Sequence, residues 1–397
     1  MPTPNEIRVS VDVGYEQHSV AIGLSDGELI DEFDIQHRPE GFKQFFNRIE
    51  LVQSVHGGLV SVAMEGYNGF ARPLDRLVQE RGYRLLNINN LKLARFKEIF
   101  PAAAKTDRID ARKGLELMQL GDVLPVARKV LQPVLATPRV NDQLKRLTRR
   151  RRALIEERTR VLNRMQTDLQ AICPGLLQIT GRAENRWFLN FITHVTDLNK
   201  LVRLQKSTLL KIPAVGQRYA AQIRAWQCAA VFSHDVDWVG PMIIEDAQRI
   251  LELGRAVEAL NQQCDALIPE SDIAMRIDSI PGFALVCSSE LAGEIGTIDR
   301  FNREASLAVY LGMATLDNSS GNQKGSKTPR HVNRRAKMAM MVGVDKHRKQ
   351  VPESQRYYEK KRLEGKSHNQ AIRALGRHLC RVIFNMLRDK RDYQPRN

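Results

Sequence analysis

Apolar and polar positions alternate in short runs near the start of the chain, and this pattern predicts a sheet. Residues 7–13, 18–24 and 28–35 alternate in this way, and Ser25-Asp26-Gly27 separates the second run from the third. An Asp-Gly pair between two alternating runs is a strong signal for a β-hairpin. We therefore expect three consecutive strands, the last two joined by a tight turn.

Helical and strand patterns alternate after these strands. Residues 40–54 and 71–81 have helical periodicity, whereas 58–64 and 83–88 are short apolar runs typical of buried strands. Further helical segments continue to about residue 120. Three antiparallel strands followed by helix, strand, helix and strand is the order of a ribonuclease H-like α/β fold. We predict a domain with this fold over residues 1–130.

A long helical arm is expected next, over residues 131–270. From Val140 to Ile172 apolar residues recur every three, four or seven positions, which is typical of a long amphipathic helix or a coiled coil. A second stretch, 243–266, has a similar pattern and is expected to pack on the first as an antiparallel hairpin. The intervening residues 174–240 contain all three tryptophans and are predicted to form an inserted helical subdomain.

The remaining region, 271–397, is predicted to be mostly helical. Ile280-Pro281-Gly282-Phe283-Ala284 and the apolar positions after it resemble a helix-hairpin-helix element, in which a glycine turn lets backbone amides approach a phosphate. A helix at 306–311 and a polar loop at 317–328 are expected to follow. Basic helices are predicted from there to the end.

Charge is distributed unevenly along the chain. The formal net charge is +16, and residues 322–397 alone contain 21 Lys and Arg against 6 Asp and Glu. The other 321 residues therefore carry a net charge of only about +1. A basic region attached to a near-neutral one favours a polyanion, such as a nucleic acid, as the partner.

The cysteines and the apolar runs restrict the class of protein further. None of the five cysteines forms a C-x-x-C pair, which argues against a ribbon or finger zinc site and for a reducing compartment. The first seven residues lack the apolar core of a signal peptide, and no apolar run approaches the length of a membrane span. We expect a cytoplasmic protein that does not interact with a membrane.

Four acidic residues are the main candidates for chemistry. Asp12 lies inside the apolar strand pattern, Glu65 ends a later one, and Asp107 and Asp110 lie where a helix should begin. Desolvating a carboxylate in a core strand is costly unless it has a partner, and a magnesium ion held by several carboxylates is such a partner. Two cations about 3.5–4 Å apart are a common device for phosphoryl transfer.

An alternative explanation exists for two of these residues. Asp107 can be an N-cap, and Asp110 a first-turn acid that interacts favourably with the helix dipole. This accounts for that pair about as well as metal binding does, but not for Asp12 or Glu65. We therefore predict that all four bind Mg²⁺.

Two further groups of residues are weighed against structural roles. Ser320 precedes a glycine in the polar loop, and a serine in this position is usually a turn residue. A run of cations is usually a solvated helix face, but the excess positive charge favours nucleic-acid binding here. The predicted nucleic-acid-binding residues are Arg149, Arg150, Arg151, Arg152, Lys324, Lys327, Arg330, Arg334, Arg335 and Lys337.

Taken together, these motifs resemble a known family. Asp12 in its strand, Glu65 ending a later strand, and Lys105-Thr106-Asp107-Arg108-Ile109-Asp110-Ala111-Arg112 resemble the DEDD catalytic domain of the insertion-sequence one-ten family of transposases, which are related to Piv-like DNA invertases. The C-terminal third resembles the second domain of that family in the order of its motifs. These motifs are Ile280-Pro281-Gly282-Phe283, Glu294 to Phe301, Tyr310 to Met313, Ser320-Gly321 and Asn385 to Pro395.

The resemblance implies a RuvC-like fold with Mg²⁺ bound by the four acidic residues. It also implies a serine nucleophile that forms a covalent phosphoserine link to DNA. Counting from Gly312 gives Ser320 as this serine, with Ser319 as the neighbour to test. The implied partners are DNA (element ends and target), a structured guide RNA from the flank of the element, and further copies of the chain. These copies would form a dimer or tetramer in which the acidic residues of one protomer meet the serine of another.

Two other functions remain open from the residues. A metal-dependent Holliday-junction-type nuclease would use water as the nucleophile and leave Ser320 as a turn residue. A non-catalytic nucleic-acid-binding scaffold would not need the four acidic residues Asp12, Glu65, Asp107 and Asp110, so their presence argues against it.

Overall fold

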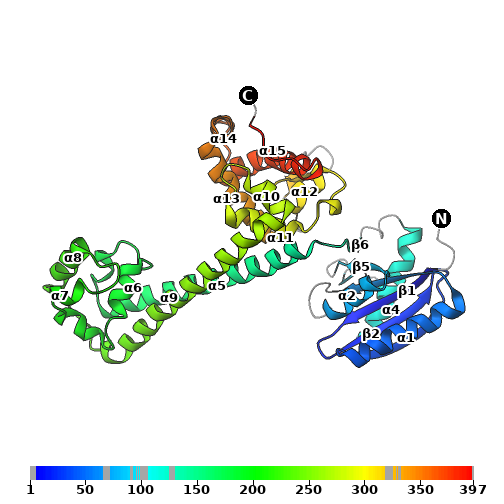
Figure 1. Cartoon of the computed structure of the whole chain (residues 1–397), viewed down its shortest axis with the longest axis horizontal. Coiled ribbons are helices and arrows are strands. Elements are labelled where there is room, and N and C mark those ends of the chain that lie inside the picture. The colour runs from blue at the N-terminus through cyan, green and yellow to red at the C-terminus, as the bar shows by residue number, and fades with distance from the viewer. Residues whose placement is uncertain are drawn as a thin grey trace. The chain divides into compact units, whose positions relative to one another are not determined.

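The chain divides into two compact units, residues 1–136 and residues 137–397 (Figure 1). We refer to them as the N-terminal and C-terminal units. The computed structural model describes residues 6–65, 72–89, 93, 94, 96, 98, 106–124, 130–317, 325–327, 329 and 332–395.

A six-stranded mixed sheet forms the centre of the N-terminal unit, with strand order β3-β2-β1-β4-β5-β6. The strands are β1 (Glu6–Val13), β2 (Gln17–Leu24), β3 (Leu29–Gln36), β4 (Leu59–Glu65), β5 (Arg84–Ile88) and β6 (Leu131–Pro133). Strands β1 to β3 are antiparallel, β4 and β5 run parallel to β1, and β6 is antiparallel to β5. The five predicted strands are confirmed, but β6 was not predicted because three residues ending in proline show no alternation.

Helices cover both faces of this sheet. Helices α1 (Pro39–His56) and α2 (Arg72–Glu80) contribute to the same apolar core as the odd-numbered side chains of β1, with Phe45 and Phe46 fully buried. Burying one such ring stabilises the fold by about 1.5–3 kcal/mol. Helix α4 (Asp107–Val123) lies on the opposite face, over β1, β2 and β4. The N-terminal unit is therefore a three-layer α/β structure.

Two long helices form the arm of the C-terminal unit. Helix α5 (Arg139–Ile172) packs against α9 (Val236–Leu267), and the two run antiparallel, because the residue numbers of the contacts rise along α5 while they fall along α9. Arg151 Nε donates to Asn261 Oδ1 at 2.6 Å, and Arg249 Nη2 donates to Glu157 Oε1 at 2.6 Å. The predicted antiparallel hairpin is confirmed.

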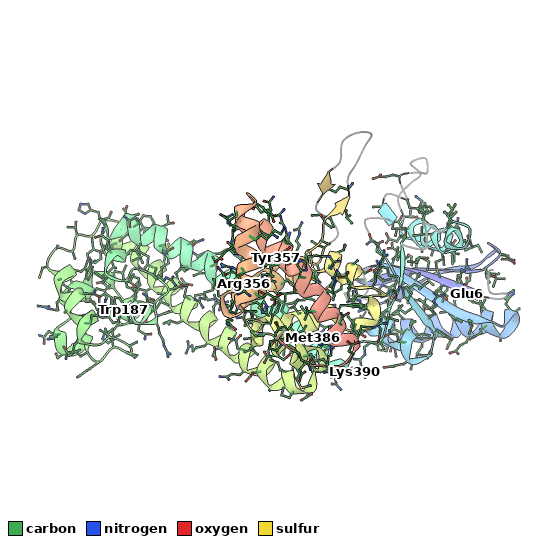
Figure 2. All side chains as sticks on the ribbon, turned by 90° about the horizontal axis from the view of Figure 1, so that it is seen from above. Glu6, Trp187, Arg356, Tyr357, Met386 and Lys390 are labelled. Atoms are coloured by element: carbon green, nitrogen blue, oxygen red, sulfur yellow. The ribbon has the colours of Figure 1, made fainter. Side chains whose placement is uncertain are left out.

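A helical head connects the two arm helices. An inserted helical subdomain was predicted over residues 174–240, but the arm helix α9 already begins at Val236. The elements of the head are η2 (Leu177–Ile179), α6 (Arg186–Ile192), η3 (Leu198–Arg203), α7 (Lys206–Leu209) and α8 (Gln217–Gln227). Trp187, labelled in Figure 2, stacks on Tyr219 with ring centroids 4.3 Å apart. Trp226 packs edge-on to Phe191, so two of the three tryptophans serve the core of the head.

The rest of the C-terminal unit is a cluster of helices at the other end of the arm (Figure 1). Its elements are η4 (Ile268–Glu270), α10 (Asp272–Asp278), α11 (Leu285–Ile295), η5 (Ile298–Arg300), α12 (Glu304–Tyr310), α13 (Arg334–Gln350), α14 (Pro352–Leu363) and α15 (His368–Arg388). Within the predicted polar loop, β7 (Leu316–Asp317) pairs antiparallel with β8 (Ser326–Lys327). In the described parts of the chain, no helix has both the length and the apolar character needed to span a bilayer.

Candidate active site and its comparison with known proteins

The carboxyl ends of two neighbouring parallel strands bring Asp12 and Glu65 to the same edge of the sheet. Val11 of β1 lies opposite Met64 of β4, so Asp12 and Glu65 are the next residues along each strand. Ser10 lies opposite Ala63, and side chains two residues apart share a face. Asp12 and Glu65 therefore lie on the same face as well as at the same edge, and both are partly exposed.

Helix α4 crosses that same face, and its register brings Asp110 toward Asp12. Arg8 Nη1 donates to the carbonyl of Met118 at 3.4 Å, and Gly114 lies against the Ser10 hydroxyl. Two residues of strand thus match four residues of helix, because both steps advance about 6–7 Å. Extending this match by one further step pairs Asp12 with Asp110.

A glycine is required where the helix passes the strand. A Cβ at position 114 would overlap the Ser10 hydroxyl, so a larger residue would displace α4 from the sheet. The first turn of α4 is capped by Thr106, whose Oγ1 accepts a hydrogen bond from the amide of Ile109 at 3.3 Å. Asp107 is the first residue of the helix and is exposed, so the N-cap alternative for it is wrong: Thr106 is the cap.

The four acidic residues have the donor chemistry of a divalent-cation site, and the registers of β1, β4 and α4 direct three of them toward one edge of the sheet. Carboxylate oxygens are the ligands that Mg²⁺ prefers. Among the described residues, no three His, Cys, Asp or Glu side chains approach one another closely enough to form a metal-binding group. The backbone registers place these positions at one edge, but the described side chains do not form a metal-binding group there, so metal binding by Asp12, Glu65, Asp107 and Asp110 stays a prediction.

The predicted nucleophile, the serine beside it and two of the predicted cations lie outside the described residues. These are Ser320, Ser319, Lys324 and Arg330. The two ends of the segment that contains them are described. On the N-terminal side, Leu316 and Asp317 pair with Ser326 and Lys327 as β7 and β8. On the C-terminal side, the amide of Asn333 donates to the carbonyl of Tyr310 at 3.0 Å.

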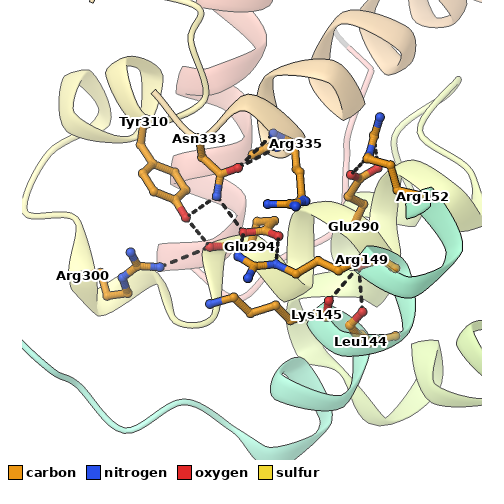
Figure 3. A network of polar contacts seen from close by, with 12 residues as sticks. Leu144, Lys145, Arg149, Arg152, Glu290, Glu294, Arg300, Tyr310, Asn333 and Arg335 are labelled. Carbon is orange, nitrogen blue, oxygen red and sulfur yellow. Dashed lines mark hydrogen bonds and ion pairs between the residues drawn. The ribbon is translucent and has the colours of Figure 1, made fainter. Parts of the chain in front are cut away.

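A buried carboxylate, Glu294, is the centre of the polar network at the base of this segment (Figure 3). Its side chain is only 1% exposed and accepts hydrogen bonds from Arg149 at 2.7 and 2.9 Å and from Asn333 Nδ2 at 2.7 Å. Asn333 Nδ2 also donates to Tyr310 Oη at 2.8 Å, and Tyr310 in turn donates to the carbonyl of Glu294 at 2.7 Å. The network therefore connects α5, α11, the end of α12 and the start of α13.

The charges around Glu294 keep it ionised despite its burial. Burial alone would raise the pKa of this carboxyl, but the hydrogen bonds from Arg149 and Asn333 and the charges of Arg149 and Lys145 outweigh that effect, so the pKa is lowered. The same burial lowers the pKa of the Lys145 amine. No sequence pattern predicts this network, because Glu294 and Arg149 are 145 positions apart.

The arginine run on α5 is mostly engaged within the protein. Besides the Arg149–Glu294 pair, Arg152 donates to both oxygens of Glu290 at 2.8 and 2.7 Å. Arg151 bonds to Asn261. Arg150 is exposed and makes no hydrogen bond or ion pair within the described part of the chain. The run was interpreted as a nucleic-acid surface, but in three of its four positions the guanidinium groups link α5 to α11 and α9.

The described cations beside the loop differ in their surroundings. Lys327, Arg334 and Arg335 are exposed, whereas Lys337 is half-buried and covers Gly312 with its aliphatic stem. Gly312 has a φ of +68°, a conformation that favours glycine. Nucleic-acid binding by these cations stays a prediction.

The glycine turn of the predicted helix-hairpin-helix element faces the interior of the unit. The two short helices are present as α10 and α11, and Gly282 in the turn has a φ of +88°. A Cβ at Gly282 would overlap the backbone of His347 in α13, and the His347 ring bonds to the carbonyl of Pro281 at 2.7 Å. The expected approach of a phosphate to this turn is therefore wrong, because α13 occupies that side.

Comparison with known proteins identifies the family. The DEDD transposase model of IS110 elements matches residues 9–174, and a model described as "Transposase IS116/IS110/IS902 family" matches residues 274–359. This chain belongs to the IS110 family of transposases. The first match contains Asp12, Glu65, Asp107 and Asp110, and the second contains Glu294 and Ser320.

Relatives of this transposase come from several bacteria. A protein of insertion element IS110 from Streptomyces coelicolor is 28% identical over 81% of this chain and 80% of its own length. A protein of insertion element IS900 from Mycobacterium paratuberculosis is 28% identical over 87% of this chain and 88% of its own length. A protein of insertion element IS116 from Streptomyces clavuligerus is 24% identical, with 80% of each chain covered. The chain is therefore a DNA transposase of an insertion sequence.

Proposed function

We propose that this transposase cuts and rejoins DNA by a magnesium-dependent phosphoryl transfer with Ser320 as the nucleophile. In this proposal the N-terminal unit is ribonuclease H-like, and Asp12, Glu65, Asp107 and Asp110 hold Mg²⁺. The main support is the register of β1, β4 and α4, since it brings acidic residues from two strands and one helix to one edge and one face of the sheet.

The proposed chemistry uses the serine hydroxyl in two steps. The Ser320 oxygen forms a bond to the scissile phosphorus, the serine proton is released, and the bond to the 3′ oxygen breaks to leave a 3′ hydroxyl. A 3′ hydroxyl of the exchanged strand then attacks the phosphoserine and releases the serine. Bound Mg²⁺ would stabilise the negative charge that develops on the phosphate.

The proposed partners follow from the charge and from the family. Most of the net charge of +16 lies in residues 322–397, which suits DNA and RNA backbones. We include a structured guide RNA from the flank of the element and assembly as a dimer or tetramer. A search of the DNA beside the gene for a structured segment complementary to both the element end and the insertion site tests the RNA part.

The acidic residues are tested by replacing one of them. We expect Asp107→Asn to abolish strand exchange while nucleic-acid affinity stays within about twofold, because one carboxylate charge is lost and the exposed side chain supports no core. The matched control is Asp26→Asn, an exposed acid in the turn between β2 and β3, which should exchange strands normally. Full strand exchange by Asp107→Asn would show that the four acidic residues do not take part in the mechanism as proposed.

A further inference from the structure

Two ion pairs tie α4 to the edge strand β3. Arg108 donates from Nε and Nη2 to Asp34 Oδ2 at 3.1 and 2.7 Å, and Arg112 pairs with Glu32 through two hydrogen bonds. The arginines are four residues apart on the helix and the acids two residues apart on the strand. This is the same step that matches α4 to β1, so the register of the helix is specified on two strands at once.

Asp34 belongs to a row of polar residues that reaches Asp12. In the sheet Asp12 lies opposite Ser19, and Ser19 lies opposite Asp34. The Ser19 hydroxyl donates to Asp34 Oδ1 at 2.7 Å. The row Asp12–Ser19–Asp34 therefore crosses three strands on the face that α4 covers, and Arg108 connects its far end to the helix turn that carries Asp107 and Asp110.

Arg108 also neutralises a charge that would otherwise disturb this face. Asp34 is a carboxylate on the same face as the acidic residues, and the hydrogen bond from Arg108 is the main reason why its pKa is lowered. An ionised Asp34 without a cation would repel the neighbouring carboxylates and compete for a divalent ion. With both of its oxygens engaged by Arg108 and Ser19, Asp34 is held away from that role.

We propose that Arg108 is a positioning residue for the magnesium site. Through Asp34 and Ser19 it holds the first turn of α4 at the position along the strands that aligns Asp107 and Asp110 with Asp12. This inference rests on the proposed function, and it adds Arg108, Asp34 and Ser19 to the residues on which metal binding depends. Outer partners of metal ligands commonly change metal affinity by about 10–100-fold when they are removed.

The Arg112–Glu32 pair offers a matched control, since it has the same chemistry one turn further along α4. Arg108 and Arg112 are exposed to similar extents, 61% and 54% for their side chains, so the alanine variants should both fold. If the ion pairs only attach the helix, the two variants should behave alike. If Arg108 positions the acidic residues, the variants should differ.

The experiment uses the full chain and two measurements. Hydrogen exchange without metal reports the order of the first turn of α4, and calorimetry with MgCl₂ reports metal affinity. For Arg108→Ala we expect faster exchange of the amides of residues 109–111 and about tenfold weaker Mg²⁺ binding. For Arg112→Ala we expect a Mg²⁺ affinity within about twofold of the wild type. A double variant that exchanges the two charges, Asp34→Arg with Arg108→Asp, should recover much of the Mg²⁺ affinity that Arg108→Ala loses.

Each outcome separates this inference from the proposed function. Unchanged exchange and Mg²⁺ affinity in Arg108→Ala, or equal losses in both alanine variants, would overturn the positioning role. Absence of Mg²⁺ binding by the wild type would instead refute the proposed function, and with it the magnesium site that Arg108 is said to position.

Discussion

Replacing Arg149 with alanine tests whether the arginine run on α5 supports the fold or binds nucleic acid. Arg149 makes two hydrogen bonds to Glu294, whose side chain is almost fully buried. Among the described residues, the variant would leave this carboxylate with Asn333 as its remaining hydrogen-bond donor and with the nearby charge of Lys145. The C-terminal unit should therefore lose stability.

The expected loss is about 2 kcal/mol. Removing one partner of a fully buried ion pair typically costs about 3–5 kcal/mol. The side chain of Arg149 is 40% exposed, so solvent screens part of the interaction, and the remaining donor to Glu294 offsets another part. Arg150 is the matched control on the next position of the helix, and its removal should change stability by no more than about 0.5 kcal/mol.

Urea unfolding followed by tryptophan fluorescence and circular dichroism measures this difference, because all three tryptophans belong to the C-terminal unit. Binding to labelled DNA or RNA over a series of salt concentrations gives the complementary result. If Arg150 contacts a phosphate, Arg150→Ala should reduce the salt slope by about 1. Wild-type stability for Arg149→Ala, with a loss of affinity as large as that of Arg150→Ala, would refute the structural role given to Arg149.

Two further predictions concern the N-terminal unit. Gly114→Ala should lower the melting temperature of this unit, with a cost of about 1–3 kcal/mol, because the added methyl group overlaps the Ser10 hydroxyl; an unchanged melting temperature would contradict the close approach of α4 to β1. His18 is buried, and its Nδ1 has no hydrogen-bond partner among the described residues. Burial, reinforced by the charge of His37, lowers the pKa of His18 to about 4. Since His18 binds a proton more readily in the unfolded chain than in the folded one, stability should fall as the pH drops from about 6.5 to 4. In a series of melting curves at different pH, His18→Gln should remove this contribution to the pH dependence of stability.

The sheet could be predicted from sequence because each of its first five strands has its own apolar pattern. The meeting of Asp12 and Glu65 at one edge also follows from sequence, since Glu65 ends its strand pattern and Asp12 lies one residue before the end of its own, in strands that were expected to lie in one sheet. Asp110 needed the structure, because its position depends on how α4 steps along β1. That step rests on the Gly114 contact with Ser10, a pair separated by more than a hundred positions.

The polar networks could not be predicted, and the reason is the same for each. Arg108 and Asp34 are 74 positions apart, and Arg152 and Glu290 are 138 apart. A run of arginines shows that positive charge is present but does not show which carboxylates fold back onto it. For the same reason the glycine turn at Gly282 was interpreted as open, whereas α13 packs against it.

Trapping the reaction intermediate tests the central claim most directly. The full chain is incubated with element-end DNA, its flanking RNA and MgCl₂, denatured and digested, and the peptides are analysed by mass spectrometry. We predict a nucleotide attached to the peptide at Ser320, formed with Mg²⁺, retained in Ser319→Ala and absent from Ser320→Ala and Asp107→Asn. Cleavage of the DNA by Ser320→Ala at the wild-type rate, with no protein–DNA adduct in any variant, would contradict this prediction and favour water as the nucleophile.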